Sequence, residues 1–154
     1  MRELHRSKAF IWTLIILFLL IWFYMLGARV LVPSDEGRYA EMAREMFTTH
    51  DWITTRLNGI KYFEKPPLQT WMNALSFELF GLGEWQARLW TGITALFGIG
   101  LVSYTGRRVF SPRVGFYAPL VLASSYLWIG LGQINTLDMG LSAMMALSLC
   151  GLLL

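Results

Sequence analysis

Residues 9–28 read AFIWTLIILFLLIWFYMLGA, a run of 20 residues without a charged side chain. An α-helix rises about 1.5 Å per residue, so about 20 apolar residues match the ~30 Å hydrocarbon core of a bilayer. A cleaved signal peptide has a shorter apolar region. This run also carries Trp22, Phe23 and Tyr24 near its end, and aromatic residues favour membrane interfaces. The run therefore predicts a retained transmembrane helix.

The composition supports this interpretation. Of the 154 residues, 55% are hydrophobic and 15% are charged, whereas soluble domains carry about 25% charged residues. These values exclude a disordered chain and a polar nucleic-acid-binding domain. A single cysteine, Cys150, excludes a disulfide framework and a cysteine-based zinc site. The net charge of +3 does not indicate a nucleic acid partner, because the basic residues lie at the ends of apolar runs.

Three further apolar runs, at residues 87–105, 114–133 and 138–154, predict three further spans. The predicted fold class is therefore an all-α integral membrane protein with about four transmembrane helices. Basic residues mark the cytoplasmic side, and they cluster before the first run and after the second: Arg2, Arg6, Lys8, Arg107, Arg108 and Arg113. This places the N-terminus in the cytoplasm and residues 29–86 on the periplasmic or extracellular side. The chain ends within the fourth run, so we expect it to be the N-terminal part of a larger polytopic protein.

The outer segment, residues 29–86, predicts two juxtamembrane helices. Ser34 is a suitable N-cap for an amphipathic helix that extends to Phe47, with the charged residues Glu41, Arg44 and Glu45 on its polar face. The Asn-Gly pair within residues 57–60 indicates a turn. A second helix is predicted at 68–80, opened by Pro67. It is too short to span comfortably, so we place it on the membrane surface.

Several side chains of chemical interest fall on this outer side. Asp35 and Asp138 are each either a catalytic acid or base or a helix cap, whereas Glu36 is interpreted as structural. Lys65, beside two prolines, is either a phosphate ligand or an interfacial lysine whose head group reaches the water. Arg38 either pairs with Asp35 or binds an anion. Tyr39 and Tyr62 either orient these groups or belong to an aromatic belt.

This combination favours one class of chemistry. A carboxylate can deprotonate an acceptor hydroxyl or amine. A nearby cation can stabilise a departing phosphate. At a lipid boundary, a lipid-linked phosphosugar is the substrate that presents such a phosphate.

Two stretches, PSDEGRYAEMAREM at 33–46 and NGIKYFEKPP at 58–67, resemble the polyprenyl-phosphate-sugar-dependent glycosyltransferases of the GT-C superfamily. The greatest similarity is to the bacterial lipid A aminoarabinose transferases and related protein mannosyltransferase-like proteins. The later stretches FGLGEWQARL at 80–89, GRRVF at 106–110 and NTLD at 135–138 fit the same pattern. The resemblance covers roughly residues 10–145.

The resemblance implies two juxtamembrane helices over an active site, with Asp35 in catalysis and Lys65 on the lipid phosphate. It also implies that Arg38, Tyr39, Tyr62, Glu64 and Asp138 line the cavity. The implied donor is a sugar on undecaprenyl phosphate, transferred with inversion at the inner membrane. The family can hold a zinc ion with help from a histidine. No histidine of this sequence matches that position, so we expect no metal and no other cofactor.

Other functions remain open at this point. A transporter or flippase would use Asp138 as an ion site, and a non-catalytic membrane scaffold would need none of these charges. The sequence does not identify the sugar, and it leaves lipid A, a protein or another glycan as acceptors.

Overall fold

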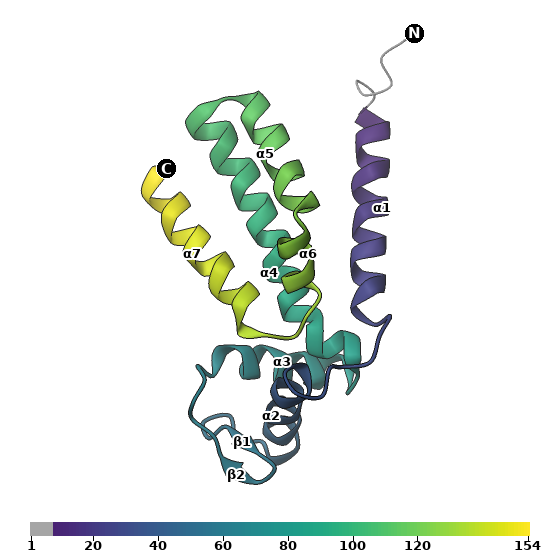
Figure 1. Ribbon diagram of the computed structural model, residues 1–154, viewed down its shortest axis with the longest axis vertical. Coiled ribbons are helices and arrows are strands. Elements are labelled where there is room, and N and C mark those ends of the chain that lie inside the picture. The colour runs from purple at the N-terminus through teal and green to yellow at the C-terminus, as the bar shows by residue number, and fades with distance from the viewer. Residues whose placement is uncertain (1–7) are drawn as a thin grey trace.

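The structure is a computed structural model that describes residues 8–154. Helices make up most of it (Figure 1). The predicted cytoplasmic residues Arg2 and Arg6 lie outside the described residues. Figure 1 shows α4, α5 and α7 side by side, while α2, α3 and a β-hairpin gather at the opposite end from the C-terminus. The apolar helices are α1 (Lys8–Leu26), α4 (Glu84–Thr105), α5 (Pro112–Ser124), α6 (Tyr126–Gly132) and α7 (Leu137–Leu153).

Two helical stretches, Ala9–Leu26 and Glu84–Phe110, are long and apolar enough to cross a membrane. The second is longer than the predicted span at 87–105, because a π-helical segment, η2 (Gly106–Phe110), continues α4. The bent pair α5 and α6 counts as a third candidate, and α7 is shorter, at 17 residues. The structure therefore contains an all-α membrane-type fold with two or three candidate spans among the described residues.

The run at 114–133 is not the straight helix that was predicted. It forms α5 and α6, which are bent by 69° relative to each other. Ser125 between them has an extended backbone, with φ −68° and ψ 122°. Pro119, inside α5, has no N–H to donate to the helix. The apolar pattern could not reveal this break, because both halves are equally apolar.

Small residues bring the apolar helices together. A Cβ on Gly132 of α6 would lie 2.8 Å from Trp22 of α1 and from Ala95 of α4. The Trp22 indole N–H donates to the Gly92 carbonyl of α4 at 3.2 Å. With Met139 of α7, Trp22 and Ala95 form a buried cluster that joins these helices.

The outer segment folds as α2 (Glu36–Thr49), a hairpin of β1 (Arg56–Leu57) and β2 (Ile60–Lys61), and α3 (Leu68–Phe80). The predicted turn is confirmed, since Asn58 and Gly59 have φ values of 54° and 77°, as a type I′ hairpin turn requires. The predicted bounds of the second helix are confirmed as well. A buried cluster then packs α2 and α3 against the start of α4: Ala43, Met46, Ala74, Phe77 and Ala87.

Two local predictions for α2 are wrong. Ser34 is not its N-cap: Asp35 occupies that position, and its side chain makes no capping hydrogen bond. Glu45 does not lie on the exposed polar face. It is buried, and its carboxylate accepts the Gly59 N–H at 3.0 and 3.1 Å, which ties the hairpin turn to α2. The turn leaves that N–H without a strand partner, and a carboxylate stabilises it.

Candidate functional site

A fully buried carboxylate, Glu36, holds together the end of the molecule that carries α2 and α3. Its side chain is fully buried and accepts six hydrogen bonds. Two come from Arg88 at 2.7 and 3.0 Å, and two come from Arg29 at 2.6 and 3.1 Å. The remaining two come from the backbone N–H groups of Val32 and Asn135, both at 2.9 Å. Each carboxylate oxygen thus accepts three bonds, so the charge is fully compensated.

These bonds control the ionisation of Glu36. Burial by itself raises the pKa of a carboxyl group, but the bonds from Arg88, Arg29 and the two backbone N–H groups outweigh it and hold the pKa of Glu36 at about 2. Glu36 is therefore ionised over the physiological pH range. A group fixed in this way is suited to a structural role.

Arg88, in the first turns of α4, uses all of its donors. Besides the two bonds to Glu36, its guanidinium donates to the carbonyls of Leu26, Arg29 and Val30 at 2.7, 2.8 and 3.0 Å. Leu26 is the last residue of α1, where a cation interacts favourably with the helix dipole and the free carbonyls. Arg88 thereby fixes the end of α1, the start of α2 and the start of α4 to one another.

Asn135, in the loop between α6 and α7, joins two more elements to this arrangement. Its side-chain oxygen accepts bonds from Gln69 and Asn73 of α3, each at 2.8 Å. Its side-chain nitrogen donates to the Glu36 carbonyl at 3.4 Å. We call Glu36, Arg29, Arg88, Asn135, Gln69 and Asn73 the polar hub. The hub connects α1, α2, α3, α4 and α7 through buried bonds.

The predicted residues Asp35, Arg38 and Tyr39 lie next to Glu36 of the hub, at the start of α2. Asp35 directly precedes Glu36 and is exposed, and it accepts a bond from Arg38 at 3.0 Å. The Arg38 guanidinium also lies over the Tyr39 ring, 5.6 Å from its centroid. Its Nε is buried and has no hydrogen-bond partner among the described residues. Arg38 thus retains a free donor beside a carboxylate.

The pKa of Tyr39 depends on the charged side chains that lie near it. Burial raises the pKa of its phenol, the positive charge of Arg38 lowers it, and the carboxylates of Asp138 and Asp35 raise it further. Asp138 is exposed, in the first turn of α7, at the second residue of the helix rather than the capping position. Asp35 and Asp138, although 103 positions apart in the sequence, therefore act on the same phenol.

Tyr62 and Glu64 form a second pair next to this group. The Tyr62 hydroxyl donates to Glu64 at 2.7 Å. This hydrogen bond is the main reason why the pKa of Tyr62 is raised, and the charge of Arg38 acts on Tyr62 in the opposite direction. Lys65 follows Glu64 and is half-buried. Among the described residues it makes no hydrogen bond or ion pair, so no contact joins it to Asp35.

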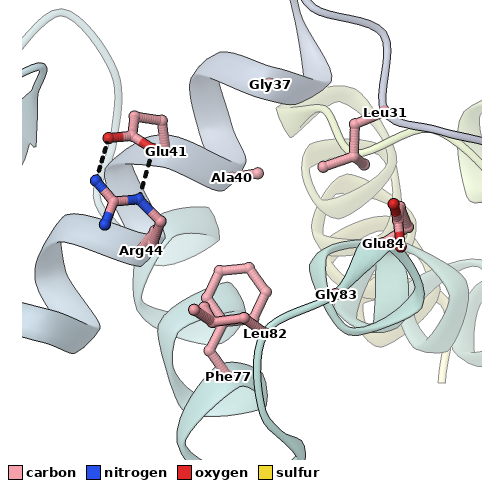
Figure 2. Close-up of a pocket in the computed structure, with 9 residues that line it drawn as sticks. All are labelled: Leu31, Gly37, Ala40, Glu41, Arg44, Phe77, Leu82, Gly83 and Glu84. Carbon is pink, nitrogen blue, oxygen red and sulfur yellow. Dashed lines mark hydrogen bonds and ion pairs between the residues drawn. The ribbon is translucent and has the colours of Figure 1, made fainter.

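A separate pocket of about 300 Å³ lies on another face of α2 (Figure 2). Leu31, Ala40, Phe77 and Leu82 make it largely apolar, and the ion pair of Glu41 with Arg44 closes one side at 2.6 Å. None of the predicted site residues lines it. Within residues 8–154, no group of three or more His, Cys, Asp or Glu side chains is placed to hold a metal ion.

Sequence reasoning did not find the polar hub. Arg88 and Asn135 lie in the stretches at 80–89 and 135–138, which were quoted only for their resemblance to the family, and Gln69 and Asn73 carried no motif of their own. The available signal was an arginine at the start of an apolar helix, together with three amides in otherwise apolar surroundings. Buried polar groups require hydrogen-bond partners. This pattern therefore predicts that the arginine and the amides lie in contact with other polar groups.

Comparison with known proteins shows the family. Residues 64–154 match the family model described as dolichyl-phosphate-mannose-protein mannosyltransferase. The chain belongs to this family. A curated relative is the undecaprenyl phosphate-α-4-amino-4-deoxy-L-arabinose arabinosyl transferase of Edwardsiella ictaluri, 37% identical over 139 residues, which are 90% of this chain and 25% of that protein. The corresponding protein of Aeromonas salmonicida is 36% identical over 82% of this chain and 23% of its own length.

The same similarity appears in solved structures of this mannosyltransferase family. The crystal structure of ArnT from Cupriavidus metallidurans in the apo state matches with a TM-score of 0.91 and 44% identity, over 96% of this chain and 28% of that one. ArnT bound to undecaprenyl phosphate matches with a TM-score of 0.92 and 43% identity, over 94% and 27%. The present chain thus spans about a quarter of the length of these relatives, and it has their fold over nearly its whole length.

Proposed function

We propose that the chain is part of a membrane glycosyltransferase that moves a sugar from an undecaprenyl-phosphate donor to an acceptor at the outer face of the inner membrane. One observation carries the proposal. Asp35, Arg38, Tyr39 and Asp138 gather beside the hub, in a chain that is 43% identical to a transferase solved with undecaprenyl phosphate. The names of the relatives favour a pentose as the sugar, and the proposed acceptor is lipid A, a protein or another glycan.

The proposed chemistry divides between two kinds of side chain. Asp35 is the base that takes a proton from the acceptor hydroxyl or amine. The acceptor then forms a bond to the anomeric carbon, while the bond from that carbon to the phosphate oxygen breaks on the opposite face. The departing phosphate gains negative charge, which Lys65 and Arg38 stabilise.

The remaining predicted residues orient the site in this proposal. Asp138, whose charge acts on the same phenol as that of Asp35, contributes a second carboxylate for catalysis. Tyr39, Tyr62 and Glu64 line the cavity, and the bond from Tyr62 to Glu64 fixes the loop that leads to Lys65. No cofactor takes part.

We also propose the arrangement in the membrane. It has four spans, with α5 and α6 together as the third and the short helix α7 as the fourth, and α2 and α3 lie on the membrane surface. The exposed residues Arg107 and Arg108 lie in η2, and Arg113 lies in the first turn of α5. Basic residues at this end of the helices favour the cytoplasm. Residues 29–86 are then periplasmic, as the predicted cytoplasmic N-terminus requires.

Asp35→Asn in the intact protein tests the catalytic assignment. Loss of the base should reduce sugar transfer by about 100-fold or more, and the amount of protein in the membrane should not change. Glu41→Gln is the matched control, since Glu41 lies on another face of α2 and pairs only with Arg44. Full transfer by Asp35→Asn would refute the assignment of Asp35 as the base, whereas absence of transfer by the parent protein would favour a transporter or scaffold.

A further inference from the structure

The polar hub connects the three segments that carry the proposed site. Asp35 is adjacent to Glu36, Lys65 lies three residues before the first residue of α3, and Asp138 lies three residues after Asn135. None of these segments is continuous with another in sequence. Their relative positions must therefore be set by contacts between elements.

Asn135 is the residue at which these contacts converge. Its backbone N–H donates to Glu36 of α2, and its side-chain oxygen accepts bonds from Gln69 and Asn73 of α3. Through its own loop it is joined to α7. All four side chains, Asn135, Glu36, Gln69 and Asn73, are at least 97% buried, so water cannot replace a bond that is lost.

We infer that Asn135 is a positioning residue that holds Asp35, Asp138 and the loop of Lys65 in register, without touching the substrate itself. The inference rests on the proposed function. An amide suits the position because one face must accept two bonds while the other donates to a carbonyl. A carboxylate would place a second negative charge beside Glu36. An apolar side chain would leave the Asn73 side-chain nitrogen without its acceptor and Gln69 bonded only to Asn73.

The first measurement follows distances between the segments. The spin labels are attached at exposed positions in a chain with Cys150→Ser. One pair, at positions 34 and 141, reports the distance from the start of α2 to α7. A second pair, at positions 75 and 141, reports the distance from α3 to α7. Electron–electron double resonance is recorded on the chain in phosphatidylcholine nanodiscs. We expect narrow distance distributions for the parent chain and broad or shifted ones for Asn135→Ala. A label pair at 104 and 117, across α4 and α5, should not change.

The second measurement is the dissociation constant for undecaprenyl phosphate in the same nanodiscs without labels. Asn135→Ala should weaken binding by about tenfold, because the bonds that hold the site together are lost. Thr136→Ala is the matched control: its hydroxyl is buried and has no partner among the described residues, so binding and distances should stay at the parent values. If Asn135 contributed only stability, Asn135→Ala would lower the melting temperature of the chain. Below that temperature, the distances and the affinity for undecaprenyl phosphate would then be unchanged.

The outcomes separate the two proposals. If the parent chain does not bind undecaprenyl phosphate, the proposed function is contradicted. If the parent binds and Asn135→Ala keeps either its distances or its affinity, the role of Asn135 is refuted and the proposed function stands. If Asn135→Ala does not fold, Asn73→Ala takes its place, because it removes one of the two bonds from α3 and Gln69 keeps the other. It must then broaden the α3–α7 distance, and an unchanged distance would refute the role.

Discussion

At the scale of single residues, Glu36 shows what its sequence context could and could not predict. Its structural role was expected, because it lies at the start of a helix beside a better candidate for chemistry. Its partners were not, since Arg88 and Asn135 are 52 and 99 positions away. Pairing over such separations is decided by the packing of helices, and a local pattern carries no information about it.

Removing the Glu36 charge should be severely destabilising. Glu36→Gln leaves the fully buried Arg88 without its counter-ion, and breaking one side of a buried ion pair costs about 3–5 kcal/mol. The measurement is thermal unfolding of the purified chain in detergent. Glu41→Gln, which breaks only a partly exposed pair, should change the stability by less than about 1 kcal/mol. Equal effects of the two substitutions would contradict the role of the hub.

Glu36 also predicts how stability depends on pH. Its pKa is about 2 in the folded chain, below the ordinary value of 4.5. A carboxyl group with a lowered pKa contributes stability that is fully present above the unfolded value and is lost as the pH falls. The melting temperature should therefore fall between about pH 4.5 and pH 2, and Glu36→Gln should show a smaller fall. A parent chain with constant stability over this interval would contradict the assigned bonds.

At the scale of elements, local signals predicted what depends on local structure. The Asn-Gly turn and the bounds of α3 were predicted because turn geometry and the positions of proline are local properties. The bend between α5 and α6 and the π-helical end of α4 were missed, since neither changes the apolar pattern. The candidate site lies between these cases: its residues were named from the sequence, but the hub that supports them was not.

The contact between α4 and α5 offers a test at this scale. A Cβ on Gly115 of α5 would lie 2.6–2.8 Å from Arg107, including its backbone, so the helices would have to separate. Gly115→Ala should lower the free energy of unfolding by about 1–3 kcal/mol. Gly100→Ala is the control, because no atom lies within 4 Å of its added Cβ, and there alanine should be neutral or stabilising. Denaturant unfolding of both variants measures this difference in the free energy of unfolding.

At the scale of the whole molecule, the charge distribution predicts orientation. Single cysteines at Ser34 and Ser111, in a chain with Cys150→Ser, should react differently with a membrane-impermeant maleimide in intact cells. Position 34 should be labelled from outside, and position 111 only after the membrane is opened. Labelling of both positions from the same side would overturn the proposed topology.

The central claim is that this chain carries the part of the site that holds the donor phosphate. The most direct test is binding of undecaprenyl phosphate to the purified chain in phosphatidylcholine nanodiscs, compared between the parent, Lys65→Gln and Lys61→Gln. Lys61 is the control, an exposed lysine at the end of β2, in the hairpin that precedes the loop of Lys65. We predict that the parent and Lys61→Gln bind equally and that Lys65→Gln binds at least about tenfold more weakly. Equal binding by all three chains, or no binding by the parent, would contradict the claim.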